Sequence, residues 1–125
     1  MSTTPTASEL AILNRLWTDG PLTVRDIHER LSDEKEVVYT TVLKTMQNMY
    51  ESGLLDRERR GRQHVYRAVI ERGKTQDRLL DRFLNRTFGG SATGLVMRAL
   101  GNYRPKKDDI QELKALIERL ENEEE

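Results

Sequence analysis

The segment EVVYTTVLKTMQNMYESG, residues 36–53, decides the fold because it contains a helix whose two faces differ in chemistry. Apolar side chains recur along it with helical spacing and form one continuous stripe. The stripe consists of Tyr39, Val42, Leu43, Met46, Met49 and Tyr50. We expect the whole stripe to belong to the core, and we expect Gly53 to end the helix.

The opposite face of this helix is polar and, over residues 39–50, carries no acidic residue. It consists of Thr40, Thr41, Lys44, Thr45, Gln47 and Asn48. Threonine and asparagine are weaker helix formers than glutamate or lysine, and an ordinary solvated helix face would carry Glu and Lys pairs. Short hydroxyl and amide groups suit hydrogen bonding to base edges in a DNA major groove. The pattern therefore favours DNA binding.

Two helices are predicted before this segment. Capping-box patterns begin at Thr6 and Thr23, where a hydroxyl and a carboxylate three residues later can satisfy the free amides of a first turn. Apolar residues with helical spacing follow each box. We expect helices at about 7–18 and 24–31.

A basic hairpin is predicted after the third helix, in LLDRERRGRQHVYRAV at residues 54–69. Side chains alternate on either side of a turn at Arg60-Gly61-Arg62. Residues 57–67 hold five arginines against one glutamate. Three helices followed by a hairpin predict a mainly α fold with a small β-hairpin, a winged helix-turn-helix. The predicted phosphate contacts of the wing are Arg59, Arg60 and Arg62.

The stretches ELAILNRLW, LTVRDIHERL, VVYTTVLKTMQNMYESGLL and RRGRQHVYRAV resemble the penicillinase-repressor family, the BlaI/MecI/CopY group of bacterial transcriptional repressors. The similarity covers nearly the whole chain, and YTTV, GLL and the closing YR are its most specific parts. It implies a homodimeric repressor that binds an inverted-repeat operator in double-stranded DNA. The third helix would enter the major groove, and the wing would touch the backbone. The residues carried over are Thr40, Thr41, Lys44, Thr45, Asn48, Arg60 and Arg62.

The second half of the chain predicts a helical dimerisation domain, residues 73–125, after a DNA-binding domain of residues 1–72. Its three amphipathic helices are separated by turns, the first at Gly89-Gly90. Their apolar residues are Leu79, Leu80, Phe83, Leu84, Phe88, Leu95, Val96, Leu100, Ile110, Leu113, Leu116, Ile117 and Leu120. So short a segment cannot bury all these faces on itself, so we expect a homodimer. The alternative is a monomer whose helices fold back on the winged domain.

Composition excludes several classes of function. With 21 basic and 21 acidic residues the formal net charge is zero, so DNA binding must depend on where the charges lie; acids concentrate over 108–125. Cysteine is absent, which excludes thiolate metal sites and copper sensing through cysteines. His28 and His64 belong to no metal-binding or nucleophile motif. We therefore expect no enzyme activity, cofactor or metal. Without an apolar span or a signal-like start, we expect a cytoplasmic protein that does not insert into a membrane.

The mode of regulation stays open at the level of sequence. In parts of the family a membrane-bound sensor protease leads to cleavage of the repressor at an Asn-Phe bond, and Arg98-Ala99 stands in the corresponding place here. Cleavage with the same specificity is therefore in doubt. Proteolysis with another preference, an unknown effector, or no inducer remain open. A metabolite-responsive winged-helix regulator and a winged helix used for protein contacts are the alternative functions.

Overall fold

The computed structural model describes residues 4–123 of the chain. The first three residues of the predicted DNA-binding domain and the last two of the acidic C-terminus lie outside the described residues. The chain divides into two compact units, residues 1–80 and 81–125. The division falls inside the helix that was predicted to open the second domain, and the functional domains at 1–72 and 73–125 stay a prediction.

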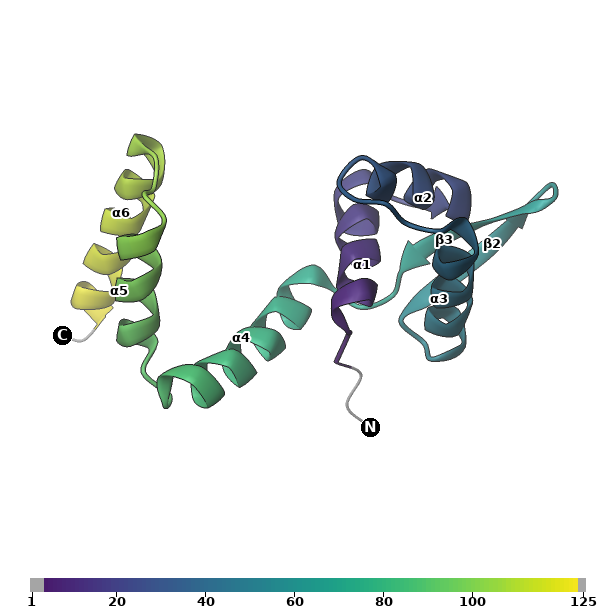
Figure 1. Cartoon of the computed structure of the whole chain (residues 1–125). Coiled ribbons are helices and arrows are strands. Elements are labelled where there is room, and N and C mark those ends of the chain that lie inside the picture. Colours follow the sequence, from purple (N-terminus) through teal and green to yellow (C-terminus); the bar gives the residue numbers. More distant parts are fainter. Residues whose placement is uncertain (1–3, 124–125) are drawn as a thin grey trace. The chain divides into compact units, whose positions relative to one another are not determined.

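The first unit is a winged helix-turn-helix, as predicted. Its elements are α1 (Ala7–Asp19), β1 (Leu22–Thr23), α2 (Val24–Ser32), α3 (Tyr39–Glu51), β2 (Leu55–Arg60) and β3 (Gln63–Ala68). The three helices pack together, and the hairpin of β2 and β3, here called the wing, projects beyond them (Figure 1). Both predicted capping boxes are present. The Thr6 hydroxyl accepts from the Glu9 amide at 3.2 Å, and the Thr23 hydroxyl accepts from the Asp26 amide at 3.1 Å.

The C-terminal end of α3 is fixed by Gly53. This residue adopts a φ of 87°, in the left-handed region that favours glycine. Its amide donates to the Tyr50 carbonyl at 3.2 Å, and the Leu54 amide donates to the Met49 carbonyl at 2.9 Å. Together the two bonds form a Schellman motif, whose apolar contact here joins two buried residues, Met49 and Leu54. The predicted helix end is thus confirmed.

The hydrophobic core lies between the three helices and the sheet. It consists of Ile12, Leu13, Leu16, Leu22, Val24, Ile27, Val42, Met46, Met49, Leu54, Leu55 and Tyr66. The centre of the α3 stripe is buried as expected. Its two ends are not, because Tyr39 is 43% exposed and Tyr50 is 37% exposed. The expectation that both tyrosines belong to the core was wrong. Each lies at the edge of the core, against a polar side chain.

The wing closes a three-stranded antiparallel sheet in the order β1-β3-β2. Arg60 pairs with Gln63, so the turn consists of Gly61 and Arg62. Gly61 has a φ of 64° and Arg62 does not have a positive φ, which is the arrangement of a type II′ hairpin turn. The third strand, β1, pairs Leu22 with Tyr66. It was not predicted, because its 2 residues are too few to show alternation.

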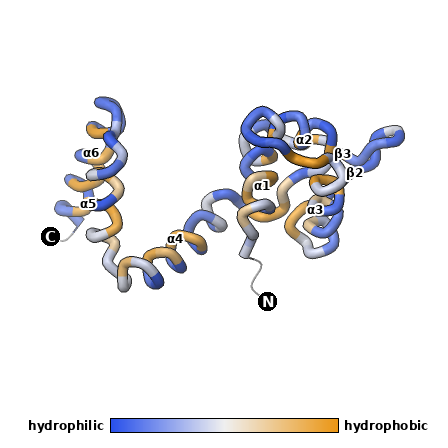
Figure 2. Tube along the Cα trace, in the orientation of Figure 1, coloured by the Kyte–Doolittle hydropathy of each residue, from blue (hydrophilic) through white to orange (hydrophobic). Residues whose placement is uncertain are grey.

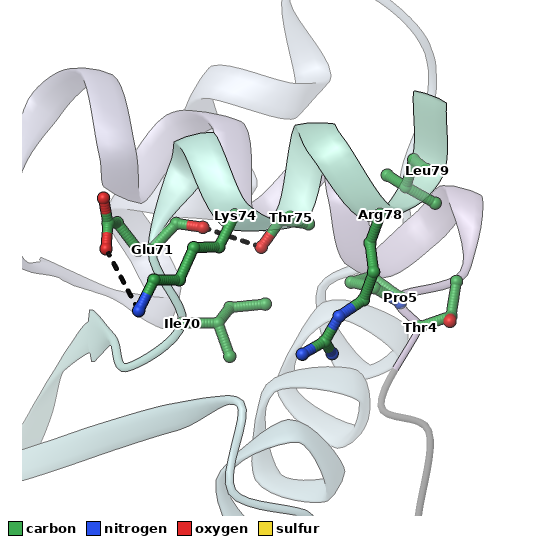
Figure 3. Close-up of a pocket in the computed structure, with 8 residues that line it drawn as sticks. All are labelled: Thr4, Pro5, Ile70, Glu71, Lys74, Thr75, Arg78 and Leu79. Carbon is green, nitrogen blue, oxygen red and sulfur yellow. Dashed lines mark hydrogen bonds and ion pairs between the residues drawn. The ribbon is translucent and has the colours of Figure 1, made fainter. Parts of the chain in front are cut away.

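The start of α4 (Arg72–Phe88) is attached to α1 within the first unit. The indole nitrogen of Trp17 donates to the Ile70 carbonyl at 3.0 Å, and Arg72 donates to the Thr18 hydroxyl at 2.9 Å. A small cavity lies beside this junction, between Pro5 and the first turns of α4 (Figure 3). The end of the wing and the start of α4 are therefore held against the core of the first unit.

The second unit contains the end of α4 and two further helices, α5 (Ala92–Asn102) and α6 (Lys107–Glu123). Gly89 and Gly90, with φ of 57° and 87°, end α4, and Ser91 caps α5 by accepting from the Gly94 amide at 3.0 Å. Within the described part of this unit no apolar side chain is buried. Hydrophobic positions recur along all three helices among polar ones (Figure 2). Over residues 4–123, no helix has the length and apolar character needed to cross a bilayer.

Candidate nucleic-acid interface

The polar face of α3 is turned away from the core. We call it the reading face, and it consists of Thr40, Thr41, Lys44, Thr45, Gln47 and Asn48. Five of these side chains are exposed, and Thr45 is half-buried. The Thr45 hydroxyl donates to the Thr41 carbonyl at 2.8 Å, so its proton is engaged within the helix. Its oxygen can still accept. The helical wheel thus predicted the direction of the face correctly, but not the engagement of Thr45.

The charge of the reading face is positive. Lys44 lies at its centre and, among the described residues, makes no ion pair. The first turn of α3 has no acidic residue, and the helix dipole adds partial positive charge there. The single acidic residue of the helix is Glu51, at its last position. An anionic ligand therefore meets no carboxylate on the first three turns of α3.

The predicted phosphate contacts of the wing surround its tip. Arg62 lies in the turn and has no ion pair or hydrogen bond in the part of the chain that the structure describes. Arg60 lies 3.7 Å from Glu58, and both side chains are exposed, so this pair is weak. Arg59 donates to the Gly61 carbonyl at 3.1 Å. Neighbouring strand residues point to opposite faces, so the arginines of the tip present positive charge on both sides of the ribbon.

Arg57 has a different task, which the sequence did not reveal. Its guanidinium lies 3.9 Å from the centre of the Tyr50 ring and donates to the Tyr66 hydroxyl at 3.3 Å. The hydrogen bond to Tyr66 raises the pKa of Arg57 above its already high usual value. The side chain thus joins the last turn of α3 to the wing. Strand alternation places Arg57 opposite Tyr66, but only the packing shows that Tyr50 lies on its other side.

The two histidines hold different parts of the first unit. His28 donates from Nε2 to the Val37 carbonyl at 2.8 Å. Its ring packs against the Tyr39 ring in a T-shaped arrangement, with the two ring centroids 5.4 Å apart. It therefore fixes the connection between α2 and α3. His64 lies on β3, in the wing. Both positions agree with the predicted helix and strand. No cluster of three or more potential metal ligands occurs in residues 4–123.

The predicted dimerisation residues form largely uncovered apolar surfaces. Those that are at least a third exposed are Leu80, Phe83, Val96, Leu100, Ile110, Leu116, Ile117 and Leu120. Those that are half-buried are Leu79, Leu84, Phe88, Leu95 and Leu113. The rings of Phe83 and Phe88 pack edge to face, with their centroids 5.7 Å apart. Met97 and Tyr103 are also exposed, although the sequence analysis did not include them.

The cavity beside α4 gives little support to a metabolite site. Its volume is about 120 Å³, whereas small-molecule sites usually have roughly 300–1,000 Å³. Two of its polar side chains already have partners: Lys74 lies 4.0 Å from Glu71, and the Thr75 hydroxyl donates to the Glu71 carbonyl at 2.8 Å (Figure 3). The cavity is therefore too small for an ordinary effector, and much of its polar lining is internally paired.

Comparison with known proteins decides the family. The model of the family described as "Penicillinase repressor" matches residues 5–119. The chain belongs to the penicillinase repressor family. The methicillin resistance regulatory protein MecI of Staphylococcus aureus (strain N315) is 20% identical over 111 residues, which cover 89% of this chain and 90% of MecI. The transcriptional regulator BlaI of Mycobacterium tuberculosis (strain H37Rv) is 37% identical over 62 residues, or 49% of this chain and 45% of BlaI.

A solved structure supports the fold of this family member. The PcaV transcriptional regulator from Streptomyces coelicolor superposes with a TM-score of 0.52 at 23% identity, over 99% of this chain and 79% of PcaV. At this identity the likeness concerns the fold alone. Family membership makes the chain a DNA-binding transcriptional repressor of the winged-helix class rather than an enzyme. The predictions of fold class, family and non-enzymatic function are confirmed.

Proposed function

We propose that this family member acts as a homodimer on an inverted-repeat operator, with one half-site for each subunit. In each half-site the reading face of α3 lies in the major groove, and the arginines of the wing tip contact the flanking backbone. The protein acts in the cytoplasm, where the bacterial chromosome lies. It silences the genes next to the operator by occupying their promoter.

The reading face carries this proposal. Its exposed lysine, hydroxyls and amides are the groups that recognise base edges, and each points away from the core. A helix used for protein contacts would more often expose large apolar or aromatic anchors. The exposed aromatic residues of α3, Tyr39 and Tyr50, instead lie at the borders of the face and contact His28 and Arg57.

The second unit supports the dimer. Residues 81–123 contain three helical segments, and none of their described apolar side chains is buried. Exposed apolar patches of this kind are unusual on a monomer and mark interaction surfaces. An identical chain is the simplest partner, because a two-fold dimer matches the symmetry of an inverted repeat. Each subunit then covers the apolar surface of the other.

Recovery of bound DNA from the genome tests the proposal directly. The chromosome of cells that express the protein is fragmented, and the fragments that crosslink to it are sequenced. We expect one recurring inverted repeat, located in promoter regions, with its two halves in a fixed spacing. Bound fragments that share no repeat would contradict operator binding. The genes beside the repeat would identify the signal to which the repressor responds.

Proteolysis in the C-terminal half is the proposed route of relief. The bond Arg98-Ala99 lies inside α5 and is exposed in the second unit. Cleavage here would remove α6 and part of α5, and with them most of the uncovered apolar surface that supports the dimer. Intact mass of the repressor, measured in cells before and after repression of the genes beside the operator is relieved, tests this route. A full-length chain under inducing conditions, with repression relieved, would contradict it.

A further inference from the structure

A cleft of about 160 Å³ separates the reading face of α3 from the wing tip in the first unit. Its lining comes from the end of β1, the start of α2, one side of α3, the turn of the wing and β3. The side chains that matter here are Arg25, Tyr39, Gln47, Arg62 and His64. An adjoining hollow shares Arg25 and Tyr39 with the cleft. The cleft therefore lies between the two surfaces proposed to touch DNA.

The charges around this cleft are positive. Arg25 and Arg62 both line it, and the described lining includes no carboxylate. The nearest acidic partner is Glu29, in the adjoining hollow, whose carboxylate lies 3.9 Å from the Arg25 guanidinium. The Arg25 and Glu29 side chains are 73% and 66% exposed, so their pairing is weak. Arg25 can leave Glu29 for a stronger anion at little cost.

His64 also lines the cleft. Its Nδ1 atom is buried and, among residues 4–123, finds no hydrogen-bond partner. Buried polar atoms without a partner are uncommon in folded proteins. This atom is closed to solvent, so the capacity of the cleft to hold an anion rests on its two arginines.

We propose that the cleft binds one phosphodiester group of the DNA backbone, held by Arg25 of α2 and Arg62 of the wing. The inference rests on the proposed function, and it adds α2 to the DNA-binding surface. A strand that meets Gln47 in the major groove and Arg62 at the wing must pass over the cleft. In helix-turn-helix proteins the first helix of the pair crosses the backbone. Arginine also binds phosphate in a bidentate manner, which fixes the position of the duplex without reading its sequence.

Three variants of the full-length protein test the site on a mixed-sequence DNA duplex several helical turns long. Binding is measured over a series of salt concentrations, and thermal melting confirms that each variant is folded. Arg25→Ala removes the cation. Arg25→Lys keeps the charge but not the bidentate geometry. Glu29→Ala breaks the same ion pair while leaving Arg25 in place. It is therefore the matched control for a purely structural role of the pair.

The expected results differ in sign. Arg25→Ala should weaken binding about tenfold. It should also make the fall of log affinity with log salt concentration, here called the salt slope, less steep by about 1 for each subunit. Arg25→Lys should keep the wild-type slope. Glu29→Ala should bind as well as the wild-type protein or better, because it removes a negative charge beside the phosphate. An unchanged slope for Arg25→Ala, or equal losses for Arg25→Ala and Glu29→Ala, would overturn the site. If the wild-type protein itself showed no salt-dependent binding, the proposed function would fail as well.

Discussion

At the scale of residues, the arginines of the wing divide by what their guanidinium groups contact. Arg57 and Arg67 contact protein partners, Tyr50 and Tyr66 for the first and Asp56 for the second. At the tip, Arg59 donates to the backbone of the turn, Arg60 has one weak ion pair, and Arg62 has no partner within the described chain. The number of arginines in the wing sequence is therefore larger than the number expected to contact phosphates. Substitutions can separate the arginines that contact protein from those expected to contact DNA.

Lys44 and the wing tip should contribute differently to DNA binding. Lys44→Ala removes the proposed base contact and should cost about 1–3 kcal/mol of discrimination between the operator and other sequences. Arg60→Ala combined with Arg62→Ala should weaken binding to all sequences and lower the salt slope, because it removes phosphate contacts. Affinities for the recovered repeat and for mixed-sequence DNA measure both effects. Equal losses on the two DNAs for Lys44→Ala would argue against a base contact.

Arg57 should behave as a positioning residue. Arg57→Met keeps an unbranched side chain but removes the hydrogen bond to Tyr66 and the cation over Tyr50. We expect a severalfold loss of operator affinity with an unchanged salt slope, because the wing loses its fixed position but no phosphate contact. Arg57→Lys keeps a cation near the Tyr50 ring and should recover part of the affinity. A slope as low as that of the double arginine variant would mean that Arg57 touches DNA.

Individual residues show how far the sequence could predict the site. The spacing of Thr40, Thr41 and Lys44 was enough to place them on an exposed face, because helix geometry fixes direction. Spacing could not predict that Tyr39 and Tyr50 lie at the border of the core. Their exposure depends on His28 and Arg57, which approach from other elements. The sequence could therefore not predict which side chains from different elements contact each other.

At the scale of elements, α3 is fixed more firmly at its end than at its start. Its N-cap, Val38, supplies no side-chain hydrogen bond, whereas Gly53 and Leu54 close the Schellman motif. The sequence predicted the helix end, since glycine is the usual residue at this position. It did not predict β1, which forms only because β3 offers its free edge to Leu22 and Thr23.

Replacement of two glycines should have opposite effects on stability. Gly53→Ala forces a side chain into a left-handed conformation and should lower the free energy of unfolding by about 1–2 kcal/mol. Gly73→Ala is the control, because Gly73 lies in α4 without positive φ, and a Cβ there would meet only the Glu71 Oε1 atom, at an ordinary contact distance of 4.0 Å. It should raise the free energy of unfolding by up to about 1 kcal/mol. Urea denaturation measures both, and a neutral Gly53→Ala would contradict the role of the Schellman motif.

At the scale of the whole molecule, the chain has one closed core and one open apolar surface. The first unit buries its apolar residues among α1, α2, α3 and the sheet, while the described residues of the second unit bury none. The sequence predicted this imbalance from helix periodicity and segment length. It could not predict how two chains pair, because the geometry of an interface depends on both partners.

Ile117→Asp should separate the subunits without unfolding them. The side chain is 57% exposed on a single chain, so a carboxylate there has solvent access in the monomer but would be buried without a partner in the dimer. Gln111→Asp adds the same charge at another exposed position of α6 and should leave the dimer intact. Light scattering at micromolar concentration gives the mass of each. A dimeric Ile117→Asp would exclude this face of α6 from the interface.

The central claim is that two reading faces bind two halves of one operator. A hydroxyl-radical footprint of the wild-type protein on the recovered DNA tests this claim most directly. Two protected segments related by two-fold symmetry are predicted, with centres a whole number of helical turns apart, about 10 base pairs for each turn. A single protected segment without a symmetric partner would contradict the dimeric repressor.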